Sequence, residues 1–251
     1  MTAEQRTVQL YDRLLGGIGE RSTQIEPRPV ASMWPHLGSR YRAGGLFLLG
    51  QALLGWDPEE CSARWQAAEA RTAEGRARIL AGTRAWHAEA PEPIATVLEV
   101  AKRARSTFWL FSRTLVDAVV PDPEHPWFAR YAWGNLYPVG WDRPGDSPWG
   151  ALKEAQDPVV GGLLRAQVEM LDPAEVVIIC RPRYWHSAAA PAGLDALPKH
   201  DGPLIAAGVV DGRAWVVGYH PRYASQGFRV GAYAYADLIA RAMRALRPPA
   251  A

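Results

Sequence analysis

The chain reads Ala-Trp-Val-Val-Gly-Tyr-His-Pro-Arg-Tyr-Ala-Ser-Gln-Gly-Phe over residues 214–228, an apolar run followed at once by a polar turn. Residues 214–219 have the apolar composition of a buried strand, and His220-Pro221 marks its end. In open α/β sheets, ligands bind beyond the carboxyl ends of the strands. An imidazole at that rim would face a substrate, although a lone histidine after a strand is more often an ordinary turn residue.

A second strand end of the same kind lies upstream, in the run Gly-Leu-Phe-Leu-Leu-Gly-Gln over residues 45–51. This continuous apolar run, closed by Gly50-Gln51, predicts a buried parallel strand that leads into a loop. Gly50 and Gly55 carry no Cβ, so the backbone can approach a ligand closely at both positions. The glycine spacing fits neither a phosphate loop nor a dinucleotide-binding fingerprint, and an ordinary strand-to-helix connection is the alternative.

Length and composition predict one globular domain over residues 1–251. The net charge of +2 makes no general polycation, so any surface for nucleic acid must be a local patch. Cys61 and Cys180 lie in apolar contexts and predict buried free thiols in a reducing cytoplasm; two cysteines are also too few for a four-cysteine iron–sulfur cluster or a cysteine-rich zinc site. We expect no signal peptide, membrane span, cofactor or metal, and a cytoplasmic monomer.

The hydrophobic periodicity predicts strands that alternate with helices. Asp211-Gly212 is a strong hairpin signal between the last two strands. A largely helical stretch, about residues 57–120, is expected as an insertion that opens at the capping sequence Asp57-Pro58-Glu59-Glu60. The pattern predicts an α/β fold with three layers, αβα, around a mainly parallel four-stranded sheet, and one antiparallel strand is added at the hairpin. Strands are expected at about 45–50, 128–136, 176–180, 204–210 and 213–219, helices at about 2–15, 148–171 (broken near Pro158) and 230–246, and a loop at 138–150.

A third strand end, Tyr131-Ala132-Trp133-Gly134-Asn135-Leu136, carries an asparagine. With Gly50-Gln51 and the segment from His220-Pro221 to Gly227-Phe228, it resembles the uracil-DNA glycosylase superfamily. That family has a Gly-Gln-Asp-Pro-Tyr-His type motif after its first strand and an asparagine at the end of its second. A His-Pro-Ser motif, followed shortly by Gly-Phe, comes after its last strand. The resemblance spans residues 35–246 and is carried by these three short motifs.

The resemblance implies hydrolysis of the N-glycosidic bond of a base flipped out of DNA. His220 would stabilise the departing base by a hydrogen bond to its oxygen. The Gln51 backbone would touch the base, and the Asn135 amide would read its polar edge unless it is only a strand-end cap. The expected substrate-binding residues are Gly50, Ala52, Leu54, Trp56 and Asn135, and the expected DNA contacts are Arg40, Arg222, Tyr223 and Ser225.

The chain departs from the family motif at two positions. Ala52 stands where the family has its water-activating aspartate, and Leu54 stands where it has a bulky tyrosine. Without the carboxylate, either activity is lost or another base serves, and the nearby acids are Asp57, Glu59, Asp142 and Asp146. The smaller residue at 54 leaves room for a pyrimidine with a large substituent at C5. Trp56, Trp141 and Trp149 would then stack on an attached sugar, if they do not simply pack in the core.

Three classes of function follow from this interpretation. The first is a monofunctional DNA glycosylase for a bulky modified pyrimidine, such as glucosylated 5-hydroxymethylcytosine, in defence against phage. The second is a non-catalytic DNA- or abasic-site-binding protein, which Ala52 favours, and the third is a nucleoside or nucleotide hydrolase. Two other pairs of residues indicate a function less clearly. Cys180 and His186 lack an acid to orient the histidine, and His186 and His200 do not have the spacing of metal ligands.

Overall fold

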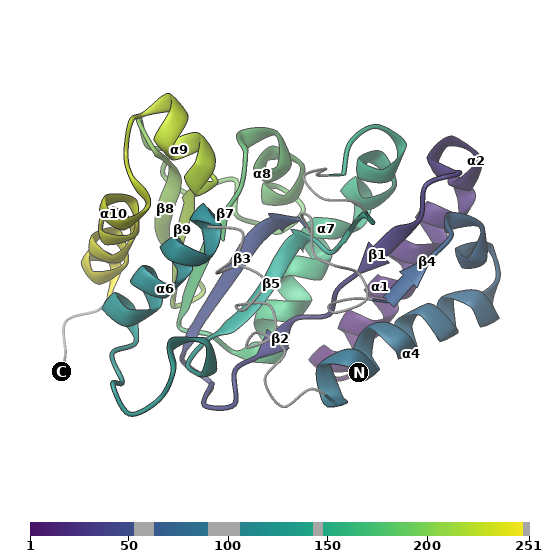
Figure 1. The fold of residues 1–251 in the computed structure, drawn as a ribbon, viewed down its shortest axis with the longest axis horizontal. Helices are drawn as coiled ribbons and strands as arrows, with labels where there is room; N and C mark the ends of the chain where they lie inside the picture. Colours follow the sequence, from purple (N-terminus) through teal and green to yellow (C-terminus); the bar gives the residue numbers. More distant parts are fainter. Residues whose placement is uncertain (53–62, 90–105, 143–147, 248–251) are drawn as a thin grey trace.

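The computed structural model describes residues 1–52, 63–89, 106–142 and 148–247 (Figure 1). Its largest sheet has six strands in the order β2-β5-β3-β7-β9-β8. The four central strands are parallel, and the two edge strands run antiparallel to their neighbours. The strands are β2 (His36–Leu37), β3 (Leu46–Ala52), β5 (Ala132–Tyr137), β7 (Glu175–Ile179), β8 (Leu204–Val210) and β9 (Arg213–Gly218).

The order of the parallel strands predicts where a crevice for a ligand would lie. Along the chain β3 comes first, yet β5 lies on one side of it and β7 on the other. Strand order therefore reverses between β3 and β7, and in doubly wound sheets ligands bind at the carboxyl ends of the strands at such a switch point. β5, β3, β7 and β9 all end at this same edge, which Figure 1 shows at the top with α8 (Pro182–Ala189) and α9 (Pro221–Gly227) along it.

Helices cover both faces of the sheet, as the α/β pattern predicts. On one face, α6 (Thr107–Val119) and α10 (Ala232–Leu246) bury their apolar sides against β3, β7 and β9. On the other face, α7 (Ala151–Leu171) and α8 pack against the same strands. α10 presents its apolar stripe at the 3.6-residue period, with Tyr235, Ile239 and Met243 fully buried. The hairpin between β8 and β9 is confirmed, and its turn residues Asp211 and Gly212 both have positive φ, as a type I′ turn requires.

A second, smaller sheet differs from the sequence prediction. It has the order β4-β1-β6, with β1 (Val30–Ser32), β4 (Ala63–Trp65) and β6 (Val139–Trp141) paired antiparallel. Trp65 therefore lies in a strand and not on the predicted helix, and the predicted loop at 138–150 contains β6. The sheet shares a core with the helices that surround it. These are α1 (Ala3–Glu20), α2 (Ser22–Ile25), η1 (Ala67–Arg71) and α4 (Ala73–Glu89), together with α7.

Three further boundaries differ from the prediction. The first helix runs on to Glu20 because its glycines allow close packing: a Cβ on Gly19 would lie 2.6 Å from the Ala70 carbonyl. α7 continues through Pro158, which is exposed, so water can reach the carbonyl that proline leaves without a partner. The strand predicted from 128 begins only at Ala132, after a 3-10 turn, η2 (Trp127–Ala129). Among the described residues, no helix is both long and apolar enough to cross a membrane.

A candidate active site at the carboxyl edge of the sheet

His220 follows β9 and begins a helix, where the sequence predicted a tight turn. It is the N-cap of α9, with Pro221 at the first helical position. Proline suits this position, because its fixed φ is helical and its missing N–H needs no partner. The imidazole Nδ1 of His220 accepts a hydrogen bond from the backbone N–H of Arg222 over 3.4 Å. Capping therefore fixes which ring nitrogen faces the backbone.

The surroundings of His220 keep it uncharged. Burial lowers the pKa of the imidazole to about 4, and the nearby cations Arg181 and Arg222 contribute to that shift. At neutral pH the ring is therefore neutral. Since Nδ1 is the acceptor, the single proton sits on Nε2, which becomes a hydrogen-bond donor. A neutral donor of this kind can stabilise a negative charge that develops on a leaving group.

Gly50, Gln51 and Asn135 lie next to one another near the carboxyl ends of β3 and β5, and Asn135 lies two residues before the end of its strand, where the sequence predicted the end itself. Gly50 is paired with Asn135 across β3 and β5, and a Cβ at Gly50 would lie 2.7 Å from the Asn135 Oδ1. The other end of the Asn135 amide contacts the Met33 Sδ at 3.1 Å. Gln51 spans the switch point, because its Oε1 accepts from the backbone N–H of Arg181 over 2.9 Å. The sequence motif thus holds together the strand ends on both sides of the crevice.

Phe108 joins the two halves of the site, a role that no local pattern in the sequence indicates. The ring lies in the first turn of α6 and is stacked on His220, with centroids 5.9 Å apart and planes 12° from parallel. Its Cζ lies 3.6 Å from the position of a Cβ on Gly50. In the sequence, Phe108 is one more apolar residue of an amphipathic helix within the expected insertion. Only the packing of α6 on the sheet brings it to the strand ends.

Arginines surround the imidazole. The Arg181 guanidinium lies 3.8 Å from the ring centroid of Tyr223, and Tyr223 lies edge-on to His220 at 6.0 Å. Burial and the charges of Arg183 and Arg222 lower the pKa of Arg181. Throughout the described part of the chain, none of these three arginines has a carboxylate within ion-pair distance. The carboxyl edge is therefore a local positive patch on a nearly neutral protein.

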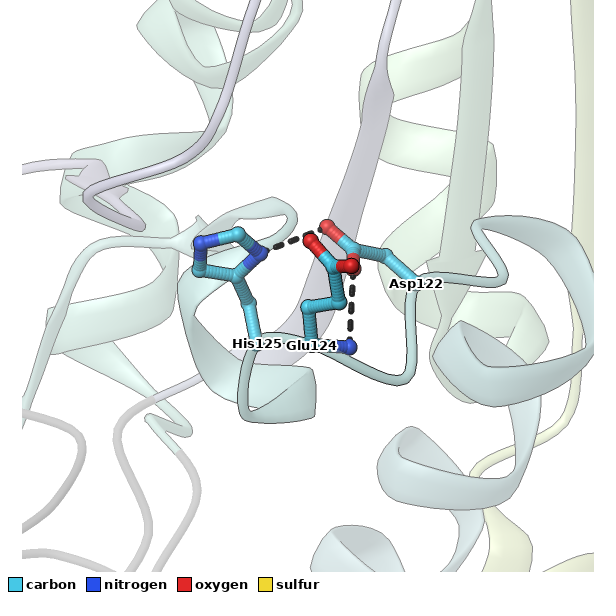
Figure 2. Close-up of side chains that lie close together, drawn as sticks. All are labelled: Asp122, Glu124 and His125. Carbon is cyan, nitrogen blue, oxygen red and sulfur yellow. Dashed lines mark hydrogen bonds and ion pairs between the residues drawn. The ribbon is translucent and has the colours of Figure 1, made fainter.

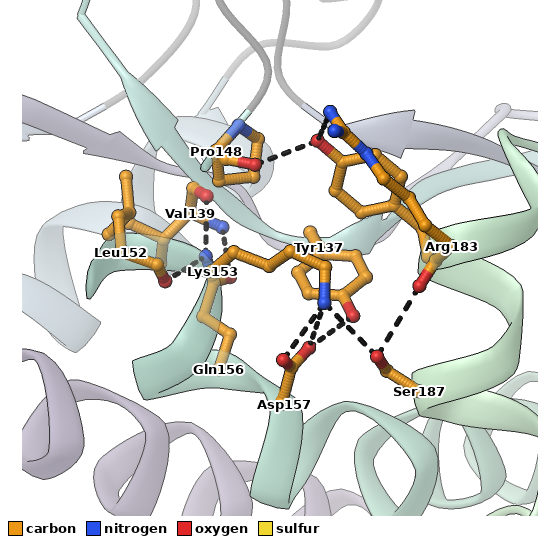
Figure 3. Close-up of polar contacts among 10 residues, drawn as sticks. Tyr137, Val139, Pro148, Leu152, Lys153, Gln156, Asp157, Arg183 and Ser187 are labelled. Atoms are coloured by element: carbon orange, nitrogen blue, oxygen red, sulfur yellow. Dashed lines mark hydrogen bonds and ion pairs between the residues drawn. The ribbon is translucent and has the colours of Figure 1, made fainter. Parts of the chain in front are cut away.

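A polar cluster ties α7 and α8 to the end of β5 below this patch (Figure 3). The Lys153 Nζ lies 2.8 Å from both carboxylate oxygens of Asp157 and 3.0 Å from the Ser187 Oγ, and Tyr137 donates to Asp157. A serine beside a lysine can be a nucleophile with its base, but here the Lys153 Nζ is already bound to both carboxylate oxygens of Asp157. Through Ser187 the cluster holds the second half of α8, the helix that follows Arg181.

The structure separates the other predicted residues. Ala52 ends β3, with its backbone opposite Tyr137, and the Ser225 Oγ donates to the Arg222 carbonyl inside α9. Arg40 does not join the site: its backbone N–H bonds the Ala129 carbonyl before β5 begins, so it lies at the opposite, amino edge. Leu54, Trp56, Cys61 and the acids Asp57, Glu59 and Asp146 lie outside the described residues.

Asp142 and Cys180 both lie inside the protein and away from any role in catalysis. The Asp142 carboxylate is buried and paired with the Arg64 Nε at 2.5 Å, so it joins the edges of the small sheet. Cys180 is buried and not in a disulfide, as predicted. Burial raises the pKa of its thiol, which makes it a poor nucleophile beside His186.

Among the described residues, one cavity borders the site and another lies at the opposite edge of the sheet. One of about 490 Å³ opens beside Tyr219 and Pro182, the chain neighbours of His220 and Arg181, and both His186 and His200 line it. The other, about 580 Å³, lies by the loop before β5, at the amino edge. There Asp122 accepts hydrogen bonds from the Glu124 backbone and from the His125 Nδ1 (Figure 2). These three side chains lie close enough to share a metal ion, but the bonds to Asp122 already account for their arrangement as a closed turn.

Comparison with models of known protein families finds no match to this chain, and comparison with curated proteins finds none either.

Proposed function

We propose that the protein is a monofunctional DNA glycosylase that hydrolyses the N-glycosidic bond of a flipped pyrimidine and leaves an abasic site. The observation that carries the proposal is the neutral His220 at the end of β9. Its Nδ1 accepts a hydrogen bond from the backbone, and arginines lie near the ring. Breaking an N-glycosidic bond places negative charge on the departing base, and a donor aimed at that charge lowers the barrier. The Nε2 N–H of the imidazole would supply this donor.

The rest of the crevice suits a base attached to a phosphodiester chain. The Asn135 amide offers both a donor and an acceptor, which matches the edge of a pyrimidine. The missing Cβ of Gly50 lets the Asn135 amide lie against β3, and Phe108 and His220 form a stacked pair of rings beside which a planar base would pack. The three arginines, which have no carboxylate partner among the described residues, would bind the phosphates on either side of the flipped nucleotide.

Water activation must differ from that in the glycosylases that the sequence resembles. Ala52 cannot act as a base, and Asp142 is held by Arg64. Glycosidic cleavage proceeds through a transition state close to an oxocarbenium ion, so departure of the base carries much of the barrier. A site built around leaving-group stabilisation would therefore retain catalysis with a weakly activated water.

The proposed substrate is a pyrimidine with a bulky 5-substituent, such as glucosylated 5-hydroxymethylcytosine in phage DNA, acted on in the cytoplasm. The cavity beside Tyr219 supports this choice, since its volume is in the range of small-molecule sites. Its lining joins an apolar wall to His186, Lys199 and His200, groups that can bind sugar hydroxyls.

The test uses DNA that carries uracil, hypoxanthine, 5-hydroxymethylcytosine or its glucosylated form, followed by alkali and detection of strand breaks. Breaks at the glucosylated base support the proposal. His220→Ala should lower the excision rate about a hundred- to a thousandfold, because it removes one preorganised donor. His125→Ala, a matched change at the amino edge, should leave the rate unchanged, and normal excision by His220→Ala would overturn the assignment.

A DNA- or abasic-site-binding protein without catalysis is the second candidate, favoured by the alanine at position 52. It predicts retarded DNA with no strand breaks for any of the four bases. Cleavage of free nucleosides but not of DNA would instead indicate the nucleoside hydrolase.

A further inference from the structure

We propose that the carboxyl edge of the sheet carries a binding surface for single-stranded DNA, here named the aromatic–arginine belt. The inference rests on the proposed function, since it names the form of DNA that the site receives. The belt consists of Trp149, Arg183, Arg181, Tyr223, Arg222 and Phe228.

The belt is continuous along the edge. At one end, Trp149 follows Pro148, whose carbonyl accepts from the Tyr184 Oη over 2.7 Å. Arg183 donates to the same Oη over 3.1 Å, and Figure 3 shows Arg183 and Pro148 together at the top of α8. Two residues earlier, Arg181 lies on the Tyr223 ring. The chain of contacts thus runs from Trp149 to the helix that His220 caps.

Phe228 extends the belt past His220. Its ring packs edge-on against Tyr219 with centroids 5.1 Å apart, and Tyr219 directly precedes His220. Along this chain of contacts Trp149 comes first, Arg183, Arg181 and Tyr223 follow, and Phe228 comes last, beyond His220. An oligonucleotide bound along the belt would pass over the candidate site.

The aromatic ends of the belt face solvent. Trp149 is 52% exposed and Phe228 is 38% exposed. One exposed aromatic residue is ordinary on a protein surface, but two that flank a candidate site with arginines between them fit a ligand with flat apolar faces. Trp149 is also held in place: the Arg28 guanidinium lies 5.7 Å from the Trp141 ring and 5.9 Å from the Trp149 ring, so the indole needs little ordering on binding.

Charge and stacking together favour a single strand over a duplex. The arginines of the belt, unpaired with any carboxylate in the part of the chain that the structure describes, attract phosphates of either form. In a duplex, however, each base is stacked on its neighbours and presents only its edge in a groove, so Trp149 and Phe228 would have no faces to cover. A single strand offers both phosphates and unstacked bases, and alternating cations and aromatic rings bind both.

The test measures fluorescence anisotropy of a labelled oligothymidylate, with a duplex and an oligouridylate of equal length as further arms. We expect the tightest binding for the single DNA strand. Trp149→Ala and Phe228→Ala should each weaken it roughly tenfold, while Trp149→Phe should restore most of the loss because the ring still stacks. Leu37→Ala removes a half-exposed side chain from the opposite edge and serves as the matched control.

Three outcomes would overturn the belt: a duplex bound as tightly as the single strand, RNA bound more tightly than DNA, or aromatic variants that bind like the wild type while thermal unfolding shows them folded. Oligothymidylate carries no base that the proposed glycosylase would excise. If the protein binds oligothymidylate but excises no modified base, only the proposed function is wrong. If it excises a modified base while the Trp149 and Phe228 variants bind as tightly as the wild type, only the belt is wrong.

Discussion

The imidazole of His220 should stay neutral, with its proton on Nε2, at pH values where most histidines are charged. Its pKa is lowered to about 4 from 6.5. At pH 5.5 about 97% of the rings should then be neutral, compared with about 9% for an unperturbed histidine. Burial is the largest cause and Arg181 the next, so Arg181→Ala should raise the pKa without returning it to 6.5.

The same shift ties stability to pH. A histidine whose folded pKa is lowered binds a proton more readily in the unfolded chain, so its contribution is complete above about pH 6.5 and is lost as pH falls toward 4. A shift from 6.5 to about 4 corresponds to roughly 3 kcal/mol at most. Because His220 is only half-buried, the measured loss should be smaller.

Nitrogen-15 NMR of the imidazole rings, recorded from about pH 3.5 to 8, measures both the pKa and the tautomer. Six histidines contribute signals, and the His220→Gln spectrum identifies the one of interest. A ring that titrates near pH 6.5, or one that carries its proton on Nδ1 at neutral pH, would contradict this prediction. In either case His220 would lack the donor state on which the proposed catalysis depends.

Three other changes test parts of the same structure. His36 is buried with its pKa lowered to about 4, so urea unfolding should show that His36→Gln removes about 2.5 kcal/mol of the stability lost between pH 7.5 and 4.5; an unchanged pH dependence would contradict this. Gly50→Ala would place a Cβ 2.7 Å from the Asn135 Oδ1, so it should lower the free energy of unfolding by about 1–3 kcal/mol and abolish base excision. Full activity would show that the crevice has room for the added methyl group. Tyr235→Phe removes the hydroxyl that donates to the Tyr219 carbonyl at 2.8 Å; it should cost about 1–3 kcal/mol and shift the His220 signals, and an unmoved spectrum would mean that the strand end is held by other contacts.

Much of the α/β fold could be predicted because its signals are local. The hairpin turn at Asp211-Gly212 follows from two residues that tolerate positive φ. The central strands are continuous apolar runs, and α10 shows its 3.6-residue stripe within the sequence of one helix. Each of these features can be judged from neighbouring residues alone.

The small sheet could not be predicted in this way. Its strands have three residues each, and β1 pairs with partners from distant parts of the chain. A three-residue run has no measurable period, and only packing against α1 and α7 makes it a strand. Gly19 lies beyond the first helix that local patterns predict, yet the structure places it inside α1. The backbone of Ala70 occupies the space that a side chain on Gly19 would need.

Local patterns were enough to identify the strand ends that carry polar groups, namely Gly50-Gln51, Asn135 and His220. How these groups act together depends on the packing of distant segments. The order of strands places Gln51 beside Arg181 across the switch point, and the packing of α6 brings Phe108 onto the imidazole. The charge state of His220 depends on burial and on an arginine from another strand end, because desolvation and electrostatic interactions act through space and not along the chain.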